Sequence, residues 1–237
     1  MSDFFEIFNP GLRYTREQQD AEKMLVVRTD QGGAGPRPLD LDSGQVVLRM
    51  PRPSAYPAAM ETPAVPPSDD KDWTFVLQQP CPECGYLASA VDARDLPRLV
   101  LALAAPWAEV LARPDVAVRP DPLVWSPLEY ACHVRDVLRL FTDRAALIRA
   151  QESPLFANWD QDATAVADRY WEADPAEVAD AITSAAQASA AEWATVTEPE
   201  WDRPGTRSNG SEFTLATLGQ YFLHDLRHHL HDVRAAI

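Results

Sequence analysis

The histidines of this chain are concentrated near its end. Of five histidines in 237 residues, four lie between His224 and His231, and the fifth is His133. His224 and His228 are four residues apart, which on a helix places both side chains on one face, one turn apart. That face also carries Tyr221 and lacks lysine and glutamate, which favours a polar cavity over a solvated surface. With a third ligand from another helix, the pair would form a facial metal site with open positions for water or substrate.

The same helix offers a second pair of candidate ligands. Asp225 and His229 are also four residues apart, but they lie beside the apolar stripe of the helix, so we favour His224 and His228. His231 shares the face of the favoured pair one turn further on, either as a reserve ligand or as a group that orients a ligand. The apolar stripe consists of Leu215, Leu218, Phe222, Leu226, Leu230 and Val233.

Four long helices are predicted to position these residues. Periodicity and capping signals predict helices over 96–112, 125–150, 175–197 and 214–234, with a helical turn at 164–171. Ser126, Pro127 and Glu129 fit the N-cap, first and third helical positions, so a capping box would start the helix that carries His133. A Gly- and Pro-rich loop over 198–211 would precede the last helix, with a hairpin as one option. The prediction is a mainly α protein with a four-helix bundle.

Two segments resemble a known family. The stretch Trp125-Ser126-Pro-Leu-Glu129-Tyr-Ala-Cys-His133 resembles the W-S-x-x-E-x-x-x-H opening of the second helix in DinB/YfiT-like proteins. The terminal H-x-x-x-H-H resembles their last helix, and residues 158–164 resemble a stretch that recurs in actinobacterial members. The resemblance covers about residues 90–237, and the order and separation of the motifs make it specific for fold and metal rather than for reaction.

The resemblance implies a four-helix bundle that binds one divalent metal through three side chains. Carried over by motif, these ligands are His133, His224 and His228, with Zn²⁺ as the default ion and Ni²⁺ or Fe²⁺ as alternatives. The superfamily includes mycothiol-dependent maleylpyruvate isomerases, which implies a transferase or isomerase that joins a small thiol, such as mycothiol, to a small electrophile. The isomerase branch tends to have Glu where this chain has His224. The alternative is a non-catalytic bundle that binds metal and ligand or senses stress.

Several side chains near these motifs are candidates for supporting roles. The sequence does not identify a catalytic residue. Candidates to contact substrate or thiol are Tyr221, Arg227 and Trp125. Candidates to accept the second N–H of a metal-bound imidazole are Glu129, Asp160 and Asp162, for which helix capping and surface solvation are equally good explanations.

A pair of cysteines offers a second kind of site. Cys81-Pro-Glu-Cys84-Gly85 has the form of half a zinc knuckle, but no second C-x-x-C follows. Three alternatives remain open: a separate structural zinc completed by His or Asp from elsewhere, a redox-active pair, and a plain turn. In an antiparallel bundle the pair should lie at the opposite end from His133, so we place it outside the main site.

Composition sets the domain plan and excludes several functions. Residues 1–50 predict a small accessory module with short strands, similar to an actinobacterial module of unknown function, followed by a Pro/Ala-rich linker over 51–72 and the bundle domain with its CxxC lead-in over 73–237. The net charge of −15 opposes binding to nucleic acid or anionic membrane. The N-terminus lacks a basic, apolar leader, which predicts a cytoplasmic protein. A homodimer is compatible with such bundles, although no interface signal is visible.

Overall fold

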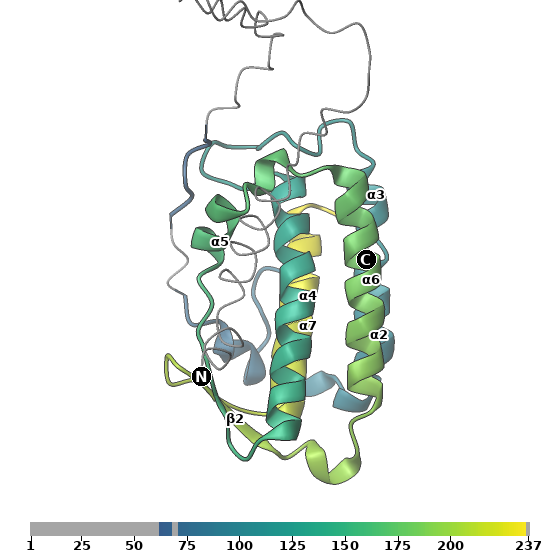
Figure 1. Cartoon of the computed structure of the whole chain (residues 1–237). Helices are drawn as coiled ribbons and strands as arrows, with labels where there is room; N and C mark the ends of the chain where they lie inside the picture. The colour runs from purple at the N-terminus through teal and green to yellow at the C-terminus, as the bar shows by residue number, and fades with distance from the viewer. Residues whose placement is uncertain (1–61, 68–70, 236–237) are drawn as a thin grey trace, which may run out of the picture. The chain divides into compact units, whose positions relative to one another are not determined.

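The computed structural model describes residues 62–67 and 71–235, so the predicted module over 1–50 and most of the linker lie outside the described residues. The described residues belong to one compact unit, Pro57–Ile237. Helices dominate this unit, which confirms the predicted mainly α bundle (Figure 1). The α-helices are α2 (Leu96–Ala104), α3 (Trp107–Leu111), α4 (Pro127–Ala150), α5 (Gln161–Ala167), α6 (Pro175–Ala194) and α7 (Leu215–Asp232).

The bundle consists of α2, α4, α6 and α7, and each of these helices packs mainly against two others. Helices α4 and α6 pack side by side, as do α2 and α7, and each pair also packs against the other. Arg149 near the end of α4 donates to Glu192 near the end of α6, so these two helices run parallel. Arg94 before α2 donates to Glu198 after α6, so α2 runs in the opposite direction. Because α4 and α6 run parallel, the chain between them is a long connection rather than a simple hairpin.

Local sequence explains where the helices begin and break. The predicted capping box at α4 is confirmed: the Ser126 side chain accepts from the Glu129 amide, and the Glu129 carboxylate accepts from the Ser126 amide. The single helix predicted over 96–112 is wrong, because α2 ends at Ala104 and α3 begins after Pro106. A proline removes one helical hydrogen bond and clashes with the preceding turn, so Pro106 starts a new helix instead of continuing the old one.

A small sheet closes the end of the bundle where α4 and α6 finish. It comprises β1 (Leu155–Phe156), β2 (Pro204–Arg207) and β3 (Glu212–Thr214) in the order β1-β2-β3. The β2–β3 pair is antiparallel, so the hairpin option for the loop before α7 is confirmed, and β1 pairs parallel to β2. In the connection between α4 and α6, Asp160 caps α5, which begins three residues before the predicted helical turn.

The residues that precede α2 run along the last helix. We call residues 71–95 the lead-in segment; it contains short 3₁₀ turns, including Trp73–Leu77. The Tyr86 hydroxyl donates to the carbonyl of Gln220, and the Gln220 side chain donates to the carbonyl of Val91. Cys81 lies farther along α7, beside His228. The lead-in segment is therefore antiparallel to α7 and covers one of its sides.

The core lies between the four bundle helices. Phe222 and Leu226 of α7 are fully buried, together with Trp193 of α6 and Leu96 of α2. Gly219 lets α7 approach the last two side chains closely, since a Cβ there would lie 2.3 Å from Leu96 Cδ1 and 3.2 Å from Trp193 Cζ3. Within the described part of the chain, we find no helix with the length and apolar character needed to cross a membrane.

Candidate metal centres

One cluster of potential metal ligands joins α4 to α7. His133 comes from the second turn of α4, and Asp225 and His229 come from successive turns of α7. Nε2 of His133 and Nε2 of His229 each lie 3.5 Å from Oδ1 of Asp225. One ligand atom from each residue lies within 4.8 Å of the others. We call this group the His133 cluster.

The atoms of the His133 cluster are poorly satisfied by the protein. His133 is 1% exposed, and neither of its ring nitrogens has a hydrogen-bond partner among the described residues. Asp225 Oδ1 is likewise buried without one. Buried polar atoms are normally paired, so His133 Nε2 and Asp225 Oδ1, which lie 3.5 Å apart, are candidate metal ligands.

Burial and neighbouring charges set the protonation states of His133 and Asp225. Nδ1 of His229 lies 2.9 Å from an oxygen of Asp232, and because a carboxylate accepts, Nδ1 is the donor in this contact. Burial lowers the pKa of His133 and favours its neutral form. Burial alone would raise the pKa of Asp225, but its contacts with His133 and His229 outweigh this and lower it. Within the cluster, His133 is therefore a neutral imidazole and Asp225 an ionised carboxylate.

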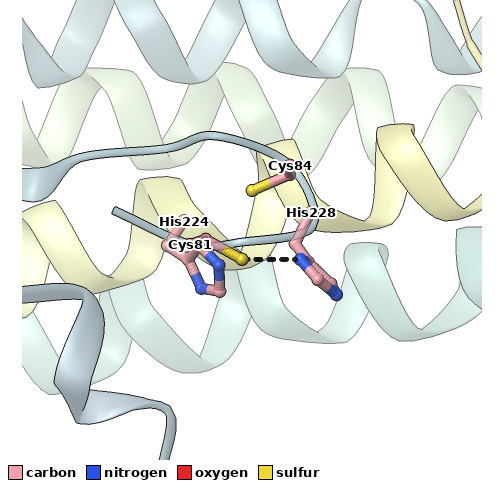
Figure 2. Close-up of side chains that lie close together, drawn as sticks. All are labelled: Cys81, Cys84, His224 and His228. Carbon is pink, nitrogen blue, oxygen red and sulfur yellow. Dashed lines mark hydrogen bonds between the residues drawn. The ribbon is translucent and has the colours of Figure 1, made fainter. Parts of the chain in front are cut away.

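A second cluster joins the lead-in segment to α7. Cys81, Cys84, His224 and His228 each offer an atom within 4.8 Å of the others. Figure 2 shows the two cysteines reaching from the lead-in segment toward the two histidines of α7. The Sγ atom of Cys81 lies 3.7 Å from Nδ1 of His228. We call this group the Cys81 cluster.

The structure therefore divides the ligand set expected from the sequence. His224 and His228 do lie together, but His133 groups with Asp225 and His229 instead. Successive helical residues point about 100° apart. The side of α7 that faces α4 carries 225 and 229, while the side that faces the lead-in segment carries 224 and 228. The choice between the two pairs depends on which neighbour covers which side of α7, and that is a tertiary property.

The expected separation of the cysteines from the main site is wrong. We placed Cys81 and Cys84 at the opposite end of the bundle from His133, yet they contact His228, the neighbour of His229 in the chain. The reason is that the lead-in segment folds back along α7 before α2 begins. Whether the pair binds metal stays a prediction.

A large cavity adjoins both clusters. Its volume is about 1190 Å³, and its wall includes Asp225 and His229 together with His224 and His228. Two of the residues expected to contact substrate, Trp125 and Tyr221, also line it. The remaining lining combines aromatic, acidic and amide side chains with the cations Lys71 and Arg207.

The other predicted site residues occupy varied positions. Asp160 and Asp162 line the cavity. Arg227 does not line it, and its charge acts instead on Cys84 and Tyr86 of the lead-in segment. His231 is half-exposed, with its ring centroid 6.2 Å from that of His228.

Of the two explanations for Glu129, the structure supports helix capping and not a contact with His133. Its carboxylate accepts from the Ser126 amide and hydroxyl and forms a bidentate pair with Arg119. Although it lies one turn before His133, its position at the start of α4 turns it toward the capping box. Neither nitrogen of His133 has a hydrogen-bond partner among the described residues.

Sequence reasoning missed three residues of this region. Trp159 stacks on His133 with ring centroids 5.2 Å apart and an interplanar angle of 10°. Asp232 fixes the ring of His229, and Arg207 of β2 lines the cavity. Asp232 was detectable, because it lies three residues after His229 on the same helix. Trp159 and Arg207 come from connections whose placement no periodicity reveals.

Comparison with known proteins places this geometry in context. The DinB superfamily model matches residues 98–233, and residues 7–48 match a family of unknown function (DUF6191). None of the curated proteins matches the chain. Among solved structures, YfiT from Bacillus subtilis, reported as a probable metal-dependent hydrolase with an unusual four-helix bundle topology, matches with a TM-score of 0.53 and 18% identity over 59% of this chain and 82% of its own. At this identity, the likeness supports the fold alone.

The superfamily match spans more than half of the chain. It includes the bundle helices α4, α6 and α7, and the residues of the His133 cluster lie on α4 and α7. Its extent is sufficient to assign the family, and the four-helix architecture agrees with it. This chain belongs to the DinB superfamily.

Proposed function

We propose that this protein is a metal-dependent enzyme whose divalent cation is held by His133, Asp225 and His229. The observation that carries the proposal is the His133 cluster itself: three ligand atoms within 4.8 Å, two of whose residues line a large cavity. This choice adopts the second pair on the last helix, 225 and 229, in place of 224 and 228.

The donor set fits a catalytic metal. Two imidazoles and one carboxylate on one side of an ion leave coordination positions open, a pattern found for Zn²⁺ and Fe²⁺ in enzymes. Asp232 orients His229, as carboxylates do behind metal-bound imidazoles. The unpaired atoms of His133 and Asp225 give the ion a role that the protein alone does not fill. Zn²⁺ is our default ion.

The cavity favours a reaction between two small molecules. A bound cation would act as a Lewis acid and lower the pKa of a coordinated water or thiol. A volume of about 1190 Å³ exceeds that of a typical single-ligand pocket, so a thiol and an electrophile fit together. Amide, hydroxyl and acidic groups line the wall, which suits a hydroxyl-rich thiol such as mycothiol. Arg207 offers a cation for a substrate carboxylate. We therefore propose a thiol-dependent transferase or isomerase.

The ligand assignment is tested by metal content. Protein purified without affinity metal or chelator is compared with His229→Ala, and His231→Ala serves as the matched control because its ring is half-exposed on the same helix. We expect His229→Ala to lose one equivalent of metal and His231→Ala to lose none, with helical content unchanged in both. Full retention of metal in His229→Ala would refute the assignment.

The reaction is tested separately with the metal-loaded protein. It is incubated with thiols, including mycothiol, and with small electrophiles, and the products are analysed by mass. A thiol adduct or a thiol-dependent isomer formed by the wild type but not by His229→Ala supports the proposal. A product that gains only water would indicate a hydrolase. Binding of metal and thiol without turnover would support the alternative of a non-catalytic binding or sensing protein.

A further inference from the structure

The Cys81 cluster carries a second inference that does not depend on the proposed reaction. Its four residues are two cysteines from one turn of the lead-in segment and two histidines one helical turn apart on α7. Cysteine thiolates and imidazoles in a two-plus-two set are the ligands of structural zinc sites. We propose that Cys81, Cys84, His224 and His228 bind a structural Zn²⁺ ion, distinct from the cation at the His133 cluster.

The distances suit such an ion. Tetrahedral zinc with Zn–S about 2.3 Å and Zn–N about 2.0 Å brings sulfur and nitrogen ligands to roughly 3.5 Å from each other. Cys81 Sγ and His228 Nδ1 lie 3.7 Å apart, and all four atoms lie within 4.8 Å. Figure 2 shows the four side chains converging on one another. Small side-chain rotations would close the set around one ion.

The turn between the two cysteines has the form of a zinc knuckle. The Gly85 amide donates to the Cys81 carbonyl at 2.9 Å, and the Cys81 amide donates to the Tyr86 carbonyl at 2.8 Å. Gly85 has φ of +70°, a left-handed conformation that glycine adopts without strain. This closed turn directs both sulfur atoms toward α7. Both cysteines are free thiols, Cys81 buried and Cys84 half-buried.

The histidines are arranged as ligands rather than as packing groups. Nε2 of His228 lies 3.5 Å from a carboxylate oxygen of Glu83, within the same turn, which leaves Nδ1 facing Cys81. Nε2 of His224 is buried without a hydrogen-bond partner in the described part of the chain.

The number of protein ligands distinguishes the Cys81 cluster, which offers four, from the His133 cluster, which offers three. The ring centroid of Trp73 lies 5.4 Å from that of His224 and 4.8 Å from that of His228. The ring centroid of Tyr86 lies 5.6 Å from that of His224. Four protein ligands would complete a tetrahedral shell and leave no open coordination position, which is typical of a structural ion. The ion would join the lead-in segment to α7 and so hold this helix in place. Asp225 and His229 of the His133 cluster each follow directly after a histidine of the Cys81 cluster in the chain.

The test uses two readouts on the full-length protein. Zinc X-ray absorption of the wild type should show sulfur scatterers at about 2.3 Å, which the His133 cluster has no atom to supply. Metal content should fall by one equivalent in Cys84→Ala and stay unchanged in Cys132→Ala, the control at the third cysteine, which belongs to neither cluster. Cobalt-substituted wild type should show thiolate-to-metal charge-transfer absorption that Cys84→Ala lacks.

The outcomes separate this inference from the proposed function. Two equivalents in the wild type, one in Cys84→Ala and one in His229→Ala support both sites. Loss of metal in His229→Ala alone, with no sulfur around zinc, overturns the structural site and leaves the proposed function standing. Loss of metal in Cys84→Ala alone, with none lost in His229→Ala, supports the structural site and overturns the proposed function. Equal metal in Cys84→Ala and wild type, or a Cys81–Cys84 disulfide in freshly purified protein, would also overturn it.

Discussion

The buried ion pair at the start of α4 gives a quantitative test of how this helix is held. Glu129 is 1% exposed and Arg119 is 13% exposed, with 2.5 Å between Arg119 Nη2 and Glu129 Oε1. The same carboxylate accepts from the Ser126 amide. Arg119→Met keeps much of the side-chain bulk but leaves a buried carboxylate without its cation. Removing one partner of a buried pair costs about 3–5 kcal/mol, and the partial exposure of Arg119 favours the lower end.

We therefore predict that Arg119→Met lowers the free energy of unfolding by about 3 kcal/mol, or Tm by roughly 6–12 °C for a domain of this size. Urea unfolding followed by far-ultraviolet circular dichroism measures this change in the bundle. Arg139→Met is the control, because Arg139 is 56% exposed and lies 3.4 Å from Asp136, a surface pair worth less than about 1 kcal/mol.

A double-mutant cycle with Glu129→Gln separates the pair from other effects of either substitution. Once Arg119 is gone, neutralising Glu129 removes the unpaired charge, so the double variant should be less destabilised than the sum of the single variants. A loss in Arg119→Met no larger than that in Arg139→Met would refute the reasoning. It would mean that water reaches Glu129 well enough to replace the guanidinium.

Two further predictions concern packing and acid stability. Gly219→Ala should gain about 1 kcal/mol of helix propensity but lose more from overpacking against Leu96 and Trp193. We expect a net destabilisation of about 1 kcal/mol, measured by urea unfolding. A stabilised variant would contradict the packing argument. The Thr197 amide and hydroxyl, with Arg149, lower the pKa of Glu200 from 4.5 to about 2, so its contribution to stability is complete above pH 4.5 and is lost as the pH falls toward 2. The difference in unfolding free energy between wild type and Glu200→Gln should therefore shrink over that range; a difference independent of pH would rule out this contribution.

Local signals account for much of what could be predicted. The capping box of Ser126 and Glu129 specifies where α4 begins, because its hydrogen bonds lie within one turn. The apolar stripe of α7 identified its buried side, and Leu218, Phe222 and Leu226 are all buried. Pro106 is also a local signal, since it divides the first predicted helix into α2 and α3.

The candidate sites depended on relations that no local signal contains. The spacing of 224 with 228 and of 225 with 229 made both pairs possible ligands, because any i, i+4 pair shares a helical face. Which pair meets His133 depends on how α7 is rotated about its axis, and that rotation follows from packing the apolar stripe against α2 and α4. The position of Cys81 depends on a lead-in segment that folds back along α7.

The sequence by itself determined that this chain forms a helical bundle with candidate metal ligands in the second half of its last helix. Periodicity and capping depend on residues close together in the chain, so they can be identified from the sequence alone. Only the tertiary structure decided that these side chains form two clusters, one beside α4 at a large cavity and one beneath a cysteine turn. The physical reason is that ligand sets are assembled by contacts between segments more than ninety residues apart, whose relative placement is set by the packing of the whole core.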